Sequence, residues 1–557
     1  MDISVEDLRS QHQALLSERE KIMPVWRMMA DNFLPLKRVL LDGDYKPEDV
    51  YTRMGEVNLN IVDATSIKSM RILAAGMQSG LTSPSKIWFR LGLSDFNLAN
   101  KSNVKKWLEE AERMIFDVMA RSDFYNSTYR CYLESATFGT TVLLILNEGD
   151  KGIRTICLPI GSYALASNAK NEIDTLYRKF YMTARQIVDK FGEENVSISI
   201  MNAYRSSGGK DKWFPIIHAI LPNERYDSSK DDAASMAYSS FYFEEASDNH
   251  DEKLLSKGGF HEKPFIAARW DVTGDSVYGE SPGMDVVFFA KGLQAMKATV
   301  YKAEQKNADP AMNVPPGMKN ASTSPGVRNY QSNPNEKITA TTDIRPNTQG
   351  ALLLIQDDRT QVTEGLFNDI FRALMLSTSN KMTAYEVMER IAEGLRLLGP
   401  VSERKQFEFL DPIIDRVFAI ILRNGMISLP PVELEGKRLN VEYISPLAQA
   451  QKAVGTQGIN KIIQLIQSIY QTKPEVIDTV NWDELILVYA DLIGVSPRII
   501  NDNDRIQMIR EIRMSMEAAA LEQEQRNQEV DNLKKMSETK VTENENAIQS
   551  AASYEAE

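Results

Sequence analysis

The sequence contains few of the residues on which many protein chemistries depend. Two cysteines, Cys131 and Cys157, occur among 557 residues, too few for a disulfide framework or a cysteine-based zinc site. The four histidines are scattered, and Phe265 stands where the pair His261-Glu262 would need a second histidine to make a zinc-protease motif. No run of about 18 apolar residues occurs, so we expect no membrane contact. We also expect no bound metal and no cofactor.

Positive charge is also in short supply. Lysine and arginine number 64 against 77 acidic residues, which gives a formal net charge of −13. This balance argues against a polybasic protein that wraps DNA, although it allows a local basic surface. The start of the sequence is polar and acidic, unlike a signal peptide. The composition is that of a globular protein, so we expect a large soluble protein made inside the cell.

Motifs for catalysis are missing. There is no G-x-x-x-x-G-K-[S/T] phosphate loop, and the nearest fragment, Gly208-Gly209-Lys210-Asp211, lacks the hydroxyl residue that would hold Mg²⁺. No G-x-S-x-G nucleophile motif occurs. Acidic pairs such as Asp231-Asp232 and Asp357-Asp358 are typical of solvated loops rather than of metal sites. The sequence therefore gives no support for an enzyme.

The first half of the chain predicts an α+β fold that is mainly helical. Apolar residues recur at helical spacing from Leu8 to Phe33, from Ile61 to Met77 and from Trp107 to Met119. From about Thr137 to Trp270, short β-branched and aromatic runs predict a mixed sheet. The predicted strands are 140–146, 153–158, 175–183, 214–221, 239–243 and 265–270, with a helix at 184–191 among them.

A long helix is predicted from Ser281 to about Lys306, with Pro282 in its first turn. Apolar residues recur along it at spacings of 3 and 4, which indicates a packing seam on one side. Lysines fall on the side away from this seam, and residues 291–345 have a modest basic excess. The seam residues are Val286, Phe289, Leu293, Met296 and Val300, and the lysines are Lys291, Lys302 and Lys306.

Prolines are concentrated between residues 307 and 350, which is typical of a linker. Strand-like runs at 337–344 and 351–355 favour a small compact insertion at least as well. A second helix is predicted over about 360–376, followed by a polar loop. A capping-box pattern at Thr383-Ala384-Tyr385-Glu386 predicts a further helix, interrupted at Gly399-Pro400. It resumes with apolar residues and closes at Asn424-Gly425. Those apolar residues are Phe407, Leu410, Ile414, Val417 and Ile421.

The C-terminal part predicts a strand at 439–444 and helices at about 447–470, 474–493 and 504–535. The last helix lies in an acidic segment. The final twenty or so residues are rich in Ser, Thr, Asn, Glu and Ala, and we expect them to be disordered.

Four stretches of the sequence resemble the portal, or head-to-tail connector, proteins of short-tailed bacteriophages. They occur in the order found in that family and together extend over most of the chain. They are 81–91 (LTSPSKIWFRL), 269–284 (RWDVTGDSVYGESPGM), 381–393 (KMTAYEVMERIAE) and 394–425 (GLRLLGPVSERKQFEFLDPIIDRVFAIILRNG).

The resemblance implies a homo-oligomeric ring, typically of twelve subunits, at one capsid vertex of the virion. Double-stranded DNA would be packaged and ejected through its channel without sequence readout. A separate terminase would drive packaging, and tail adaptor or gatekeeper proteins would dock on the ring. The major capsid protein and scaffolding or internal core proteins would be further partners, with synthesis in the host bacterial cytoplasm.

The same resemblance implies a division of the chain into the parts of a portal subunit. They are a wing at 1–280, stem helices at 281–306 and 357–376, a clip at 307–356, a channel loop at 377–383, a long kinked helix at 384–430, a crown at 431–503, and a C-terminal helix or barrel with a disordered tail at 504–557.

Several polar residues are then expected to face DNA in the channel. Lys381 lies in the predicted channel loop, and Lys291 and Lys302 lie on the basic side of the first stem helix. Ser377, Thr378, Ser379 and Asn380 would offer weak phosphate contacts. Lys319 and Arg328 are candidates for partner docking in the clip. For Lys381 and for the stem and clip residues, ordinary solvent exposure is the competing interpretation.

Two other functions stay open at this point. One is a helical scaffolding or adaptor protein of the virion without a channel, supported by the acidic helix at 504–535. The other is a metal-dependent nuclease that would use the scattered carboxylates. A ring would distinguish a portal from an adaptor, and metal-dependent DNA cleavage would identify a nuclease.

Overall fold

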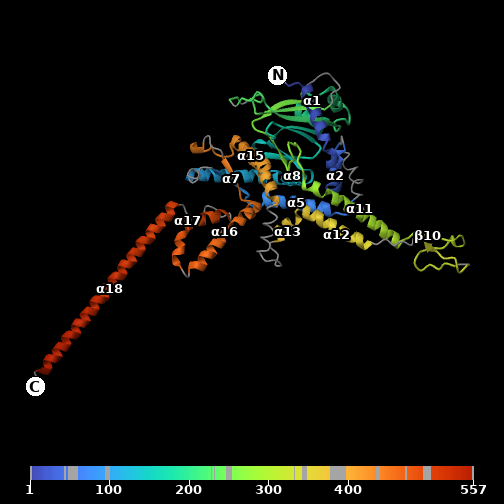
Figure 1. The fold of residues 1–557 in the computed structure, drawn as a ribbon. Coiled ribbons are helices and arrows are strands. Elements are labelled where there is room, and N and C mark those ends of the chain that lie inside the picture. The colour runs from blue at the N-terminus through green and yellow to red at the C-terminus, as the bar shows by residue number, and fades with distance from the viewer. Residues whose placement is uncertain are drawn as a thin grey trace. The chain divides into compact units, whose positions relative to one another are not determined.

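A computed structural model describes residues 3–42, 46–47, 61–93, 101–227, 229–230, 232–245, 254–330, 333–341, 348–376, 397–434, 439–470, 473–492 and 503–554. It has two compact units, Met1–Val454 and Gly455–Glu557 (Figure 1). Each is described by itself.

A layer of helices forms the centre of the first unit. α2 (Met23–Phe33), α5 (Thr65–Leu81) and α8 (Phe124–Phe138) pack on one another. Their apolar positions recur at helical spacing, so one side of each helix enters the common core. The largest side chains there, including Trp26 and Phe33, are completely buried.

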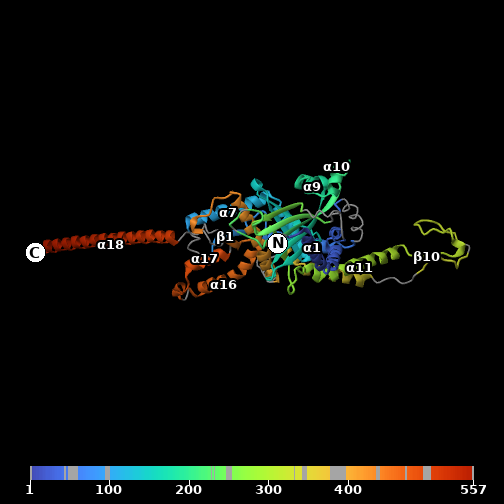
Figure 2. The same cartoon turned by 90° about the horizontal axis from the view of Figure 1, so that it is seen from above.

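Two antiparallel sheets lie beside this layer (Figure 2). The smaller has the order β3-β2-β9, and the larger, β4-β5-β6-β7-β8, follows chain order as a meander. α1 (Val5–Glu20) contributes Val5 and Leu8 to one face of the larger sheet. α9 (Ala184–Phe191) and α10 (Ile198–Arg205) cover part of the other face. The strands are β2 (Thr140–Asn147), β3 (Ile153–Leu158), β4 (Tyr163–Ser167), β5 (Ile173–Thr183), β6 (Trp213–Pro222), β7 (Tyr238–Glu244), β8 (Ser256–Phe260) and β9 (Phe265–Arg269).

A small ladder joins segments far apart in the sequence. β1 (Phe89–Leu93) pairs antiparallel with β12 (Leu439–Tyr443). Next to this ladder, α7 (Ser102–Arg121) packs against α15 (Asp411–Arg423). Trp107 of α7 donates its indole N–H to the carbonyl of Ser428 at 2.9 Å, so the chain beyond α15 is tied to the first half.

The second unit is helical. α16 (Pro446–Tyr470) enters it, followed by η6 (Pro474–Thr479), α17 (Trp482–Leu492) and α18 (Asn503–Tyr554). Arg510 and Asp483 form an ion pair of 2.6 Å between α18 and α17. The expected single helix at 474–493 is split into η6 and α17.

The expected disordered tail is instead helical up to Tyr554. α18 contains neither Gly nor Pro, so no residue with a strong helix-breaking tendency stops it after Lys535.

The predicted α+β, mainly helical class is confirmed, and most predicted strands lie where they were expected. The strand predicted at 351–355 was wrong, because these residues belong to α12 (Thr348–Gly365). Leucine favours helix as readily as strand, so such a run is ambiguous. Of the run at 337–344, the structure describes residues 337–341, and these contain β11 (Thr339–Ala340), paired with β10 (Met312–Asn313).

The second long helix therefore begins earlier than expected and is also interrupted. Phe367, with a φ of 54°, separates α12 from α13 (Asn368–Leu376).

The helix that leads into α15 departs from regular α-helix in a turn that follows Gly399-Pro400. Gly399 and Pro400 lie within helical residues 397–405, and a π-turn follows at Gln406–Leu410. Pro412 has no N–H for the carbonyl four residues earlier, and the π-turn directly precedes it. The wider turn contains an extra residue, so Phe409 is buried while Phe407 is 70% exposed.

Candidate nucleic-acid interface

The first predicted DNA-facing helix is present as α11 (Pro282–Ala308). Its start is fixed on the C-terminal end of α8 by polar contacts. Ser281 caps α11, its Oγ accepting from the Met284 N–H at 3.2 Å. The same hydroxyl donates to the carbonyl of Thr137 at 2.8 Å. The cap thus supplies a helix-start partner and a tertiary contact at once.

Gly279, in the segment 269–284, lies against Gly139 at this junction. Gly139 follows α8 with a φ of 81°, a conformation that favours glycine. A Cβ at Gly139 would lie 2.0 Å from the carbonyl oxygen of Gly279. The two backbones therefore cross in contact, which fixes where α11 leaves the core.

α11 and α12 form an antiparallel helical pair that extends from the core to β10 and β11 (Figure 1). Val286 and Leu293 are buried in the seam as expected, and Phe289, Met296 and Val300 are partly buried. Val362 of α12 is also buried. A Cβ at Gly365 would lie 2.3 Å from a methyl group of Val286, so glycine permits the close approach of the two helices.

Asp63, just before α5, holds both helices by its carboxylate. Lys297 of α11 donates to it at 2.8 Å, and Arg359 of α12 at 2.7 Å. Burial would raise the pKa of Asp63, but hydrogen bonds from Lys297, Thr65 and Arg359 lower it below its usual value. Asp63 therefore remains ionised and joins three elements.

Lys291 and Lys302 are both exposed on α11. Neither makes an ion pair or side-chain hydrogen bond within the described part of the chain. Lys306 is exposed as well. The predicted placement of these lysines away from the seam is therefore confirmed, whereas contact with DNA remains a prediction.

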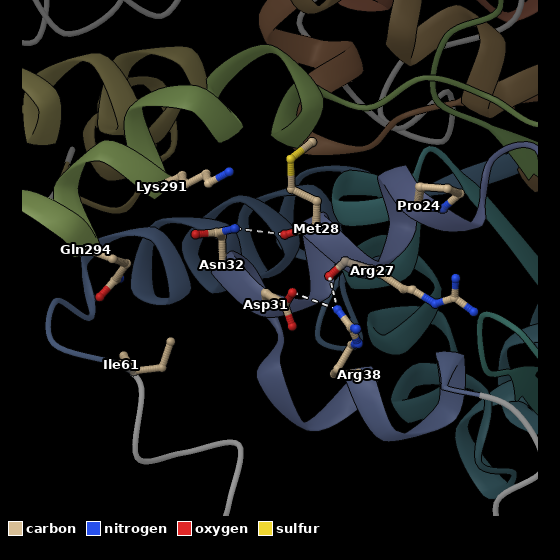
Figure 3. Close-up of a pocket in the computed structure, with 9 residues that line it drawn as sticks. All are labelled: Pro24, Arg27, Met28, Asp31, Asn32, Arg38, Ile61, Lys291 and Gln294. Carbon is tan, nitrogen blue, oxygen red and sulfur yellow. Dashed lines mark hydrogen bonds and ion pairs between the residues drawn. The ribbon is translucent and has the colours of Figure 1, made fainter.

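A surface pocket of about 500 Å³ lies beside Lys291, between α11 and α2 (Figure 3). Arg27 and Arg38 supply further positive charge, and Asp31 supplies negative charge. Arg38 pairs with Asp31 at 2.7 Å and with Asp42 at 2.8 Å. Burial raises the pKa of Asp31, and Asp42 adds to this while Arg38 opposes it. Cationic side chains therefore outnumber carboxylates in the lining of this pocket.

Arg27 and Arg38 were not predicted as part of this site, because they lie far from α11 in the sequence. No periodicity or motif marks them as neighbours of Lys291. Lys319 and Arg328, by contrast, are exposed in the segment that contains β10. The predicted loop residues Lys381, Ser377, Thr378, Ser379 and Asn380 lie outside the described residues, as does the capping box at Thr383.

Within the described ranges, no three His, Cys, Asp or Glu side chains are grouped so that they would hold a metal ion. Among the same residues, no helix combines the length and apolarity needed to cross a membrane.

Comparison with known proteins gives consistent results over nearly the whole chain. The family model of the bacteriophage head to tail connecting protein matches residues 5–500. The portal protein of Salmonella phage epsilon15 is 36% identical over 520 residues, 92% of each chain. The probable portal protein of Bordetella phage BPP-1 is 33% identical over 533 residues, 95% of this chain and 94% of that protein. This chain therefore belongs to the bacteriophage head-to-tail connecting protein family.

Proposed function

We propose that this chain is the subunit of a portal, a homo-oligomeric ring at one capsid vertex that joins head to tail. Its role is structural rather than enzymatic. The observation that carries the proposal is the similarity to two portal proteins over more than nine-tenths of the chain. The comparisons favour neither a channel-free adaptor nor a nuclease.

Exposed apolar side chains on the α11–α12 pair support assembly with further copies. Phe288 is 80% exposed, Leu353 74% and Leu354 57%. Leu352, Leu353 and Leu354 are consecutive and all exposed, and neighbouring exposed apolar side chains are typical of protein contacts. In a cyclic ring, each subunit uses two different faces, one toward each neighbour. These side chains suit such a contact between neighbouring subunits. The resemblance to the family suggests a ring of about twelve subunits.

The lysines of α11 support a channel for double-stranded DNA. Lys291 and Lys302, repeated around a ring, would form bands of positive potential that contact phosphates without reading bases. Lys381 and the polar loop residues Ser377, Thr378, Ser379 and Asn380 are proposed to add further contacts. Because the chain as a whole is acidic, its attraction for DNA stays local, which suits a conduit that must release its cargo.

The partners follow from the same proposal. The segment around β10 and β11, with exposed Lys319, Arg328 and Tyr330, is proposed to dock the terminase large subunit and tail adaptor proteins. The capsid shell and scaffolding or internal core proteins would surround the ring in the virion.

Electron microscopy of the purified protein tests the ring directly. We expect end-on views with a central hole and rotational symmetry near twelvefold. Leu353→Lys places a charge in the proposed contact, so this variant should stay monomeric by sedimentation. Its circular dichroism spectrum should show that it is still folded. Leu429→Lys, at another exposed leucine (83% exposed), is the matched control and should still assemble. Monomeric wild-type protein, even with its scaffolding protein added, would contradict the proposal.

A further inference from the structure

Arg178 of β5 is buried in the larger sheet but has no acidic partner among the described residues. It is 8% exposed, and its Nε–H donates to Nδ1 of His218 at 3.0 Å. Its guanidinium lies 4.7 Å from the centre of the Phe180 ring, and Tyr242 lies near enough to affect its pKa. All these described partners are uncharged or aromatic.

His218 does not balance the charge of Arg178. Burial lowers the pKa of His218 well below its usual value, and the nearby Arg178 adds to the effect, so the ring is neutral. Because Nδ1 accepts from Arg178, the ring proton lies on Nε2, which donates to Ser240 Oγ at 2.9 Å. The pair therefore fixes the guanidinium in place and leaves its charge unchanged.

A second cation, Lys190, lies against Tyr242, one of the rings near Arg178. Lys190 of α9 places Nζ 4.4 Å from the centre of the Tyr242 ring. Tyr242 stacks on His218 with ring centres 3.9 Å apart and meets Phe180 edge-on at 6.5 Å. Arg178 lies over Phe180 and Lys190 over Tyr242, so the two cations border one pair of neighbouring rings.

No carboxylate within the described segments forms an ion pair with Arg178 or with Lys190. Burial, and then the positive charges of Arg178 and Arg154, lower the pKa of Lys190, consistent with an uncompensated positive field. A buried arginine without a counter-charge is costly, since water no longer solvates it. Partners that orient the guanidinium also prepare it for planar, two-pronged binding of an oxyanion.

We propose that Arg178 and Lys190 form an oxyanion-binding site that accepts a phosphate ion or a carboxylate group. The guanidinium would supply the fixed, buried contact and the ammonium of Lys190 the exposed one. The site lies on the larger sheet beside α9 and requires neither α11 nor the proposed ring.

The full-length protein tests the proposal with inorganic phosphate as the probe. At constant ionic strength, binding to the protein should broaden the ³¹P resonance of phosphate, and this effect should saturate. Phosphate should also raise the melting temperature of the protein. Lys190→Gln should weaken apparent phosphate affinity about tenfold. Lys210→Gln is the matched control, since Lys210 is also an exposed lysine over a ring, 5.0 Å from Tyr204, and it should change nothing.

Arg178→Met should abolish saturable phosphate binding, and Lys190→Gln keeps the test valid if Arg178→Met does not fold. A short glutamate peptide in a parallel titration distinguishes the sources: tighter phosphate binding identifies a free ion, and tighter peptide binding identifies carboxylates of another chain. The proposal is overturned if the wild type binds neither probe saturably, or if Lys190→Gln and Lys210→Gln behave alike.

Discussion

Asp63 and Arg359, separated by 296 positions in the sequence, form an ion pair of 2.7 Å. The Asp63 side chain is 2% exposed, and Lys297 completes the group from α11 at 2.8 Å. One carboxylate therefore attaches both helices of the α11–α12 pair, which bears the candidate DNA-facing lysines, to the start of α5.

Asp63→Asn should lower the free energy of unfolding by about 2 kcal/mol, because it leaves Lys297 and Arg359 beside each other without their counter-charge. Urea unfolding at pH 7 measures the change. Asp42→Asn is the matched control: Asp42 is 36% exposed where it pairs with Arg38, so the loss there should stay below about 1 kcal/mol.

The advantage of wild type over Asp63→Asn should also depend on pH. Because the pKa of Asp63 is lowered in the folded protein, its contribution is complete above the unfolded pKa of about 4. It should then be lost as the pH falls below about 4. Equal losses for Asp63→Asn and Asp42→Asn at pH 7 would contradict the assigned role of Asp63.

The π-turn before α15 is held to β9 by a second ion pair, which is partly buried. Arg269 Nη2 donates to Glu408 at 2.9 Å, and the backbone N–H of Arg269 donates to the same carboxylate at 2.8 Å. Glu408→Gln should cost about 3 kcal/mol of unfolding free energy. Arg404→Gln, which removes a more exposed partner 3.7 Å from Glu408, should cost less than about 1 kcal/mol. Thermal unfolding of the two variants provides the comparison.

The sequence predicted the course of the chain better than its long-range contacts. The helix at 184–191 and the start of α11 are confirmed because capping and periodicity are local signals. The exposure of Phe407 was not predictable, since it depends on one extra residue in the turn before Pro412. Neither the pairing of β1 with β12 nor the proximity of Arg27 to Lys291 leaves a local pattern.

Lys405 should make the stability of the protein depend on pH in the alkaline range. The side chain is buried, contacts Ser135 Oγ and donates to the carbonyl of Arg269 at 3.2 Å. Burial lowers the pKa of Lys405 to about 7, although Glu408 opposes this. Between about pH 7 and pH 10 the unfolded chain therefore binds more protons than the folded one, and stability should rise with pH.

Lys405→Met should remove this dependence, because the variant has no proton to bind at this position. The wild-type free energy of unfolding should rise relative to the variant by up to about 1.4 kcal/mol per pH unit. Urea unfolding from pH 7 to pH 10 gives both slopes, and the exposed Lys68→Met variant should follow the wild type. Parallel slopes for wild type and Lys405→Met would show that Lys405 stays charged when buried.

Assembled rings should bind DNA more weakly when Lys291 and Lys302 are both replaced by glutamine. Removing a lysine that neutralises one phosphate reduces the slope of log K against log salt by about 0.9 in magnitude. The double variant should therefore show a slope shallower by at least about 1, equally for unrelated DNA sequences, because these lysines read no bases. Lys106→Gln, at an exposed lysine on α7 away from α11 in both views (Figures 1 and 2), should keep the wild-type slope. Rings of the double variant that keep the wild-type slope would show that the exposed lysines of α11 meet water or protein rather than DNA.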